Sequence, residues 1–101
     1  MPITRSGYRS NADKAELARF YNSAAWKRTR AAVLERAGHR CEWCREPANG
    51  RHRLDVVHLA SSTLELLRGG GDPLNPEILA AGHRGCHAAY SSGKLGPPRR
   101  R

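Results

Sequence analysis

The sequence predicts a small α+β domain, with helices at its N-terminal end, that is stapled by a zinc ion. The chain has 101 residues, of which 39% are hydrophobic, and this is enough for one compact domain but not for two. Apolar residues recur at helical spacing in the first half, whereas Val56 and Val57 form an apolar β-branched run in the second. Two short segments, Cys41–Cys44 and His83–Cys86, each carry two metal ligands three positions apart.

A stabilising element besides the hydrophobic core, such as a bound metal ion, is expected because the folded part of the chain is small. Below roughly 70–80 residues, a hydrophobic core alone seldom leaves more than a few kcal/mol of net stability. The chain contains three cysteines, so they cannot all pair in intrachain disulfides. Its N-terminus lacks the apolar run of a secretory signal or membrane span. We therefore expect a cytoplasmic protein without a membrane partner, whose cysteines bind metal.

The first half of the chain predicts a basic arm followed by two helices. Residues 1–10 are polar and are expected to be flexible. Ser10 or Asn11 is expected to cap a short helix that runs through Phe20. The second helix is expected from Ala24 to Ala37, with Ser23 as its N-cap and Gly38 as its left-handed stop. Its core face carries Trp26, Val33, Leu34 and Ala37, and Trp26 is interpreted as a core anchor rather than a surface for nucleobase stacking.

The second half predicts a hairpin, a loop and a closing helix. Turn residues at 45–50 and the strand pattern of 51–59 favour a β-hairpin across that turn. The segment 61–72 is expected to be an irregular loop with at most one helical turn. Asn75 followed by Pro76 is a helix-start signal, and a last helix is expected from Cys86 to Ser92. The domain is thus expected to span 11–92, followed by a disordered basic tail over 93–101.

The two ligand pairs predict one tetrahedral zinc site. Cys41 and Cys44 are separated by two residues, and His83 and Cys86 repeat that spacing 39 residues after Cys44. The resulting Cys₃His set uses every cysteine in the chain and leaves no position for water, so the zinc is expected to be structural. A redox dithiol, the other interpretation of Cys41 and Cys44, would leave Cys86 unexplained.

The charge of the chain predicts a polyanionic partner. There are 18 Lys+Arg against 9 Asp+Glu, a formal net charge of +9, and only three of the basic residues are lysine. Arginine binds phosphate in a planar, bidentate geometry that lysine cannot adopt. A protein that is basic only for solubility is the alternative. The expected phosphate contacts to DNA are Lys27, Arg28, Arg51, Arg53 and Arg84.

A combination of motifs carries a family resemblance. A basic helix with Trp26 is followed by the Cys41–Cys44 pair, a hydrophobic strand ending in His58, a Gly-rich loop with Asp72 and Asn75, and Cys86 next to His87. From about Phe20 to Tyr90 this combination resembles the HNH endonucleases, in particular the small phage and bacterial members with a structural zinc. The resemblance implies a ββα-metal (His-Me finger) fold. It also implies metal-dependent hydrolysis of DNA phosphodiester bonds with low sequence specificity, in a bacterial host cell or encoded by a phage, with phage packaging or genome-processing proteins as possible partners.

The resemblance also implies roles for individual residues. His58 would be the general base, His87 a ligand of a catalytic Mg²⁺, Mn²⁺, Ni²⁺ or Zn²⁺ ion, and Asn75 the residue that ties the loop to the site. The sequence departs from the family at Val57, where most members carry an acidic or histidine ligand. In an alternative register the places of an Asp-His pair are taken by Ala60 and Ser61. Asn75 lies twelve residues before His87, a longer gap than most members show.

Other interpretations of these residues stay open at this point. His58 is also compatible with a strand histidine, His87 with the fourth zinc ligand beside Cys86, and Asn75 with a simple helix cap. The alternative function is a catalytically weakened or inactive zinc-containing DNA-binding module of the same fold, which Val57 favours. An RNA-binding zinc protein is a third alternative, which the small number of aromatic residues near the basic segments disfavours.

Overall fold

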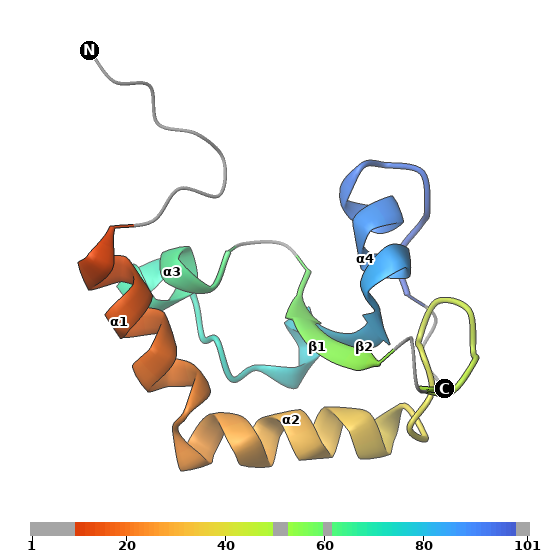
Figure 1. Cartoon of the computed structure of the whole chain (residues 1–101), viewed down its shortest axis with the longest axis horizontal. Helices are drawn as coiled ribbons and strands as arrows, with labels where there is room; N and C mark the ends of the chain where they lie inside the picture. Colours follow the sequence, from red (N-terminus) through yellow and green to blue (C-terminus); the bar gives the residue numbers. More distant parts are fainter. Residues whose placement is uncertain (1–9, 50–52, 60–61, 99–101) are drawn as a thin grey trace.

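Four helices surround a two-stranded antiparallel sheet in the part of the chain that the computed structural model describes, residues 10–49, 53–59 and 62–98 (Figure 1). The small α+β fold class is confirmed. In chain order the elements are α1 (Asn11–Tyr21), α2 (Ala24–Arg36), β1 (Leu54–His58), α3 (Thr63–Glu65), a π-helical turn η1 (Leu66–Gly70), a 3₁₀ turn η2 (Pro76–Ile78), β2 (Leu79–His83) and α4 (Arg84–Ser91).

The caps of the first two helices lie where the sequence predicts them. The Ser10 hydroxyl accepts a hydrogen bond from the Asp13 backbone N–H at 3.1 Å, and the Ser23 hydroxyl accepts one from the Trp26 N–H at 3.1 Å. Both bonds satisfy backbone donors that have no partner within the helix. After α2, Gly38 adopts a left-handed conformation with φ 68°, which glycine tolerates without a steric penalty.

The strand β1 does not form the expected hairpin across the turn at 45–50. It pairs instead with β2, in a register that runs from Leu54 opposite His83 to His58 opposite Leu79. In the described part of this region, Arg40 before the turn forms an isolated bridge with Pro47. The hairpin prediction is wrong because β1 pairs with an apolar run that comes about twenty residues later in the chain. That run is buried on both faces, so it lacks the alternating pattern by which a strand is recognised in a sequence.

The helix expected to start at Asn75 forms only as a 3₁₀ turn, η2. Asn75 does cap a turn, since its side-chain oxygen accepts from the Glu77 N–H at 3.0 Å, but the 3₁₀ turn ends at Ile78. Leu79, Ala80 and Ala81 then enter the sheet with 0% exposure. Burial of this short run on both faces outweighs the helix propensity of its alanines. The last helix starts at Arg84, two residues earlier than expected, and has Ser92 as its C-cap.

One face of the sheet packs against α2. Trp26, Val33 and Ala37 of α2 form the core with Leu79 and Ala81 of β2, and Trp26 is only 5% exposed. Val56, Phe20, Leu34 and Leu74 pack against this core. Trp26 is therefore the core anchor that its helical spacing predicts.

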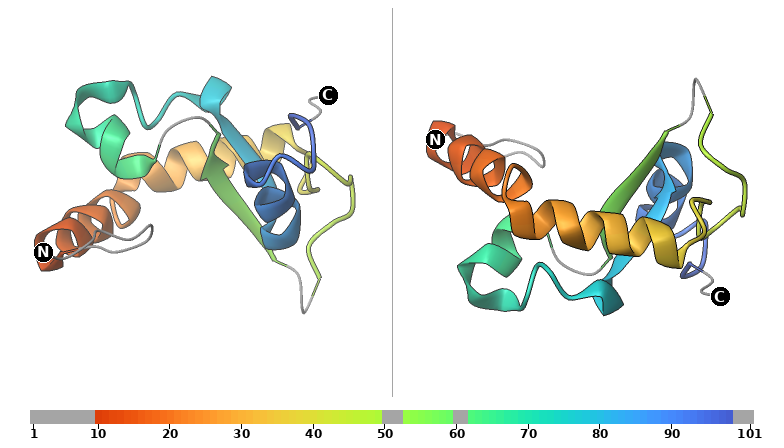
Figure 2. Two further views of the ribbon diagram at one scale, coloured as in Figure 1. Left: turned by 90° about the horizontal axis from the view of Figure 1, so that it is seen from above. Right: turned by 90° about the horizontal axis from the view of Figure 1, so that it is seen from below.

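The other face of the sheet is covered by Trp43 and α4. A Cβ atom on Gly82 would lie 2.4 Å from the Trp43 ring, so only glycine allows this approach. The Trp43 ring lies 5.6 Å from that of Tyr90 on α4, measured between centroids, and its Nε1–H donates to the Gly96 carbonyl oxygen at 3.0 Å. Views from above and below show α2 and α4 on opposite sides of the sheet (Figure 2).

The segment between the strands is more ordered than the irregular loop that its composition predicts. Ser62 and Glu65 form a capping box around α3, and Leu64 and Leu66 are buried. The Arg68 guanidinium bridges back to the carboxylates of Asp13 and Glu16 on α1. The segment is thus held by one helical turn, two buried leucines and an ion-pair bridge.

Candidate metal centre and nucleic-acid interface

Four metal-ligating side chains from two distant segments meet beside one end of the sheet. Cys41 and Cys44 lie in the loop after α2, His83 ends β2, and Cys86 lies in the first turn of α4. One ligand atom from each of these residues lies within 4.8 Å of the other three. The Cys₃His cluster that the sequence predicts is therefore assembled.

Local backbone conformation brings the two sulfurs of the loop together. His39 and Arg45 are left-handed, with φ of 58° and 70°, and the reversals that they make fold the loop back on itself. The Cys41 N–H donates to the Glu46 carbonyl at 2.9 Å, and the Arg45 N–H donates to the Cys41 carbonyl at 2.9 Å. These bonds close a tight turn that carries both cysteines.

The Cys41 sulfur is prepared to carry negative charge. Burial raises the pKa of its thiol, but hydrogen bonds from backbone N–H groups, including those of Cys44, His83 and Trp43, outweigh burial and lower the pKa from 9.0 to about 7. Burial and the proximity of the other two sulfurs raise the pKa of Cys86 to about 12. A negative charge on Cys86 is thus disfavoured beside the other two sulfurs unless a cation lies between them.

Histidine 83 presents the correct nitrogen to the cluster. Its Nε2 lies 3.2 Å from the Pro47 carbonyl oxygen, which can only accept a hydrogen bond, so Nε2 carries the proton. Its Nδ1 lies 3.4 Å from the Cys44 sulfur and keeps its lone pair for a metal. A hydrogen bond that fixes the orientation and tautomer of a histidine ligand is a usual feature of zinc sites.

The donor set fits a structural zinc ion. Three thiolates and one imidazole are typical of tetrahedral zinc sites in which every ligand comes from the protein. An open cavity of about 450 Å³ next to the cluster gives an ion access from solvent. It is lined by Cys44, Glu46, Pro47, Asn49, His83, Gly85 and Cys86. The zinc-binding prediction is thus supported by ligand type, proximity and access.

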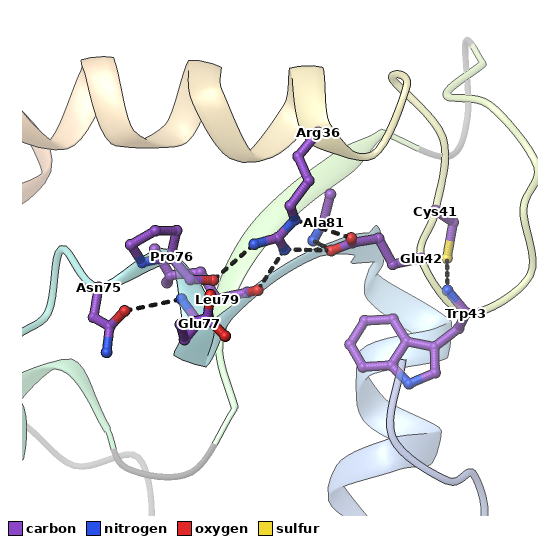
Figure 3. A network of polar contacts seen from close by, with 9 residues as sticks. All are labelled: Arg36, Cys41, Glu42, Trp43, Asn75, Pro76, Glu77, Leu79 and Ala81. Atoms are coloured by element: carbon purple, nitrogen blue, oxygen red, sulfur yellow. Dashed lines mark hydrogen bonds and ion pairs between the residues drawn. The ribbon is translucent and has the colours of Figure 1, made fainter. Parts of the chain in front are cut away.

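A buried ion pair ties this loop to α2 and to the sheet (Figure 3). The Glu42 carboxylate is 1% exposed and accepts hydrogen bonds from Arg36 at 2.9 and 3.3 Å and from the Ala81 N–H at 2.9 Å. Arg36 also donates to the carbonyl oxygens of Pro76, at 2.7 Å, and Leu79, at 2.8 Å. A single charged network therefore fixes the loop between the cysteines relative to the core.

The His58 side chain lies on the α2 side of the sheet. Its ring stacks on Trp26, with centroids 5.7 Å apart and an interplanar angle of 25°. Its Nε2–H donates to the Pro73 carbonyl at 2.8 Å, and its Nδ1 lies 3.1 Å from the Thr63 hydroxyl, which also contacts the Tyr21 hydroxyl at 2.7 Å. Both ring nitrogens therefore have partners within the chain.

The predicted metal ligand His87 lies on the opposite side of the sheet from His58. Side chains alternate along a strand, so Val57 points to the face that is covered by α4. His87 lies on α4, with its ring 6.3 Å from that of Trp43 and its Nε2 3.5 Å from the Ser91 hydroxyl. His83, not His87, joins the zinc ligands. In the part of the chain that the structure describes, no hydrogen bond or ring contact links His58, Asn75 and His87.

The basic residues expected to contact DNA fall into two groups. Lys27 and Arg28 are exposed on α2. Arg53 and Arg84 are exposed at the opposite end of the sheet, because Arg53 precedes Leu54, which pairs with His83. Arg51 lies outside the described residues. The sequence therefore predicted exposed cations but not their division between two regions.

Sequence reasoning assigned no role to the two residues between the first pair of cysteines. Glu42 accepts the buried ion pair, and Trp43 covers the sheet face opposite α2. One signal pointed to Trp43, which is one of only two tryptophans in the chain. The signal for Glu42 was its position between two predicted zinc ligands and six residues after Arg36. A carboxylate in that position can reach an arginine at the end of the preceding helix.

Comparisons with known proteins do not connect this arrangement to a family. No family model, no curated protein and no solved structure matches the chain. The helices within the described residues are all too short or too polar to cross a lipid bilayer.

Proposed function

We propose that this protein is a zinc-stapled module of the HNH endonuclease type that binds duplex DNA. The observation that carries the proposal is the Cys₃His cluster, which joins the loop after α2 to the junction of β2 and α4. The chain then presents β1, β2 and α4 in the strand–strand–helix order that the HNH resemblance implies. The formal net charge of +9 supports a polyanionic partner.

Binding of a fluorescent duplex by the zinc-loaded chain, measured by anisotropy over a range of salt concentrations, tests this proposal. Affinity is expected to fall steeply with salt, with a log–log slope of about −0.9 for each phosphate neutralised, because bound cations release counterions from the duplex. Duplexes of different sequence should bind almost equally. Binding that does not depend on salt, or that is tighter to single-stranded RNA than to the duplex, would contradict the proposal.

Metal-dependent DNA cleavage is a second candidate function, and one observation favours it. Val57 and His87 lie on the same side of the sheet, which is where the HNH resemblance puts the two ligands of a catalytic divalent ion. Such an ion would stabilise the charge that develops on the leaving oxygen of the phosphodiester. Valine has no lone pair, and His58 would have to leave Thr63 and Pro73 to take a proton from water. We therefore propose that cleavage by the unmodified protein is weak.

A Val57→Asp variant is expected to nick supercoiled plasmid faster than the unmodified protein, and at lower concentrations of Mg²⁺ or Mn²⁺, because a carboxylate adds a hard oxygen ligand. Val57→Asn, which has a similar shape without the charge, is the matched control, and adding His87→Ala should remove the gain. Nicking would be measured on agarose gels with and without chelator. If Val57→Asp is folded and zinc-loaded but its metal dependence is unchanged, this assignment of the cleavage site is wrong.

A further inference from the structure

Three cations lie on the exposed part of α2. Arg28 is on the side away from the core, Lys27 is at the flank of the helix, and Arg30 is one turn after Trp26, at the edge of the core-facing side. Lys27, Arg28 and Arg30 are all exposed, and within the described residues none of their side chains forms a hydrogen bond or an ion pair. We call these three residues the α2 basic surface. Uncompensated charge of one sign raises the local concentration of ions of the opposite sign.

The acidic residues near the α2 basic surface are mostly engaged elsewhere. Asp13 and Glu16 on α1 bind Arg68, and Glu42 binds Arg36 in the interior. On α2 itself the only carboxylate is Glu35, near the C-terminal end of the helix. Apart from Glu35, the nearby carboxylates are thus held in other ion pairs, which leaves the positive charge of α2 available to a partner.

Small side chains separate the cations. Ala24, Ala31 and Ala32 are exposed on the same helix, so small side chains occupy much of its outer side. A polyanion with a rigid, regular backbone can approach such a surface closely, and long arginine side chains can then reach phosphates on either side. A surface without pockets favours a duplex over a folded acidic protein, because a folded protein would need shaped pockets to bind tightly.

The α2 basic surface is separated from the other basic group. Because α2 and α4 cover opposite faces of the sheet, the outer side of α2 points away from Val57, His87 and the start of α4 (Figure 2). Arg53 and Arg84 lie at the far end of the sheet. One straight segment of duplex cannot lie against both regions.

We infer that the α2 basic surface, and not the region of Arg53 and Arg84, is the main phosphate-binding surface for duplex DNA. This inference rests on the proposed DNA-binding function. It also bears on cleavage, the second candidate function. A duplex bound along α2 lies on the opposite side of the sheet from Val57 and His87, so the protein anchors DNA without presenting it to that face.

Two charge-matched variants test the inference. The triple variant Lys27→Ala, Arg28→Ala, Arg30→Ala is expected to bind duplex more than about 10-fold more weakly at low salt. Its log–log salt slope should be shallower by about 0.9 for each phosphate that is no longer neutralised. The control variant Arg53→Ala, Arg84→Ala, Lys94→Ala removes the same charge and should weaken binding less than about 3-fold. Circular dichroism and zinc content confirm that both are folded.

The outcomes separate this inference from the proposed function. Equal losses of affinity in the two variants, or a larger loss in the control, would overturn the α2 assignment while duplex binding stands. If the unmodified protein does not bind duplex at all, the proposed function fails and the inference fails with it.

Acetylation of the unmodified, zinc-loaded protein gives an independent measurement. The chain has three lysines, at positions 14, 27 and 94, and all three are exposed. Mass spectrometry should show that saturating duplex slows acetylation of Lys27 by more than about 10-fold, because the phosphates cover its ammonium group. Lys94 should react at an unchanged rate. Protection of Lys94 without protection of Lys27 would overturn the inference.

Discussion

Replacing Cys86 with serine is expected to abolish cooperative folding. A structural zinc site contributes about 10–16 kcal/mol of apparent binding energy near neutral pH, which exceeds the total stability of about 5–15 kcal/mol that is usual for a small domain. Cys86 is not part of the hydrophobic core, so the loss would come from the metal site and not from a cavity. Circular dichroism should show reduced helix content and no cooperative thermal transition, and metal analysis should show no bound zinc.

Substitutions of two histidines provide the matched control for this prediction. His83→Ala removes a ligand and should resemble Cys86→Ser, as should Cys41→Ser. His87→Ala, four residues further along the chain, should keep one zinc per chain and a cooperative transition, because His87 contacts Trp43 and Ser91 rather than the cluster. A well-folded His83→Ala protein with its full zinc content would contradict the assignment of ligands.

Truncation of the buried carboxylate is expected to have the second-largest effect. Glu42→Ala would leave the Arg36 guanidinium without its anion and the Ala81 N–H without an acceptor. Breaking one side of a buried ion pair typically costs about 3–5 kcal/mol. The Arg36 side chain is 27% exposed, so water can partly solvate its charge and the lower end of that range is expected here. The free energy of unfolding of the zinc-loaded protein, measured by urea denaturation, should fall by that amount.

Glu35→Ala is the control for Glu42→Ala. Glu35 is an exposed carboxylate on α2, and its removal should change the free energy of unfolding by no more than about 0.5 kcal/mol. Replacement of both Arg36 and Glu42 by leucine should cost less than Glu42→Ala alone, because no unpaired charge remains. Equal effects of Glu42→Ala and Glu35→Ala would mean that the buried network does not stabilise the fold.

Local signals in the sequence were sufficient for the first two helices and for the metal ligands. Ser10, Ser23 and Gly38 act through bonds to residues only a few positions away, so their roles could be predicted from spacing alone. The ligand pairs could be predicted because each CxxC or HxxC spacing forms its own turn, and because zinc requires that the two pairs meet.

Local sequence patterns could not predict which segments pair in the sheet. The partner of β1 is a run of leucine and alanine that has high helix propensity, and its strand conformation depends on burial between α2 and Trp43. Asn75 is a cap, as one of the open interpretations held, but it caps a 3₁₀ turn. Which face of the sheet His58 and Val57 occupy also depended on the strand pairing, and so could not be predicted beforehand.

X-ray absorption at the zinc edge of the purified protein tests the zinc-stapled architecture most directly. We expect one zinc per chain, coordinated by three sulfur atoms at about 2.3 Å and one nitrogen at about 2.0–2.1 Å, with no bound water. A well-folded protein without zinc, or a zinc ion bound mainly by oxygen and nitrogen, would contradict that architecture.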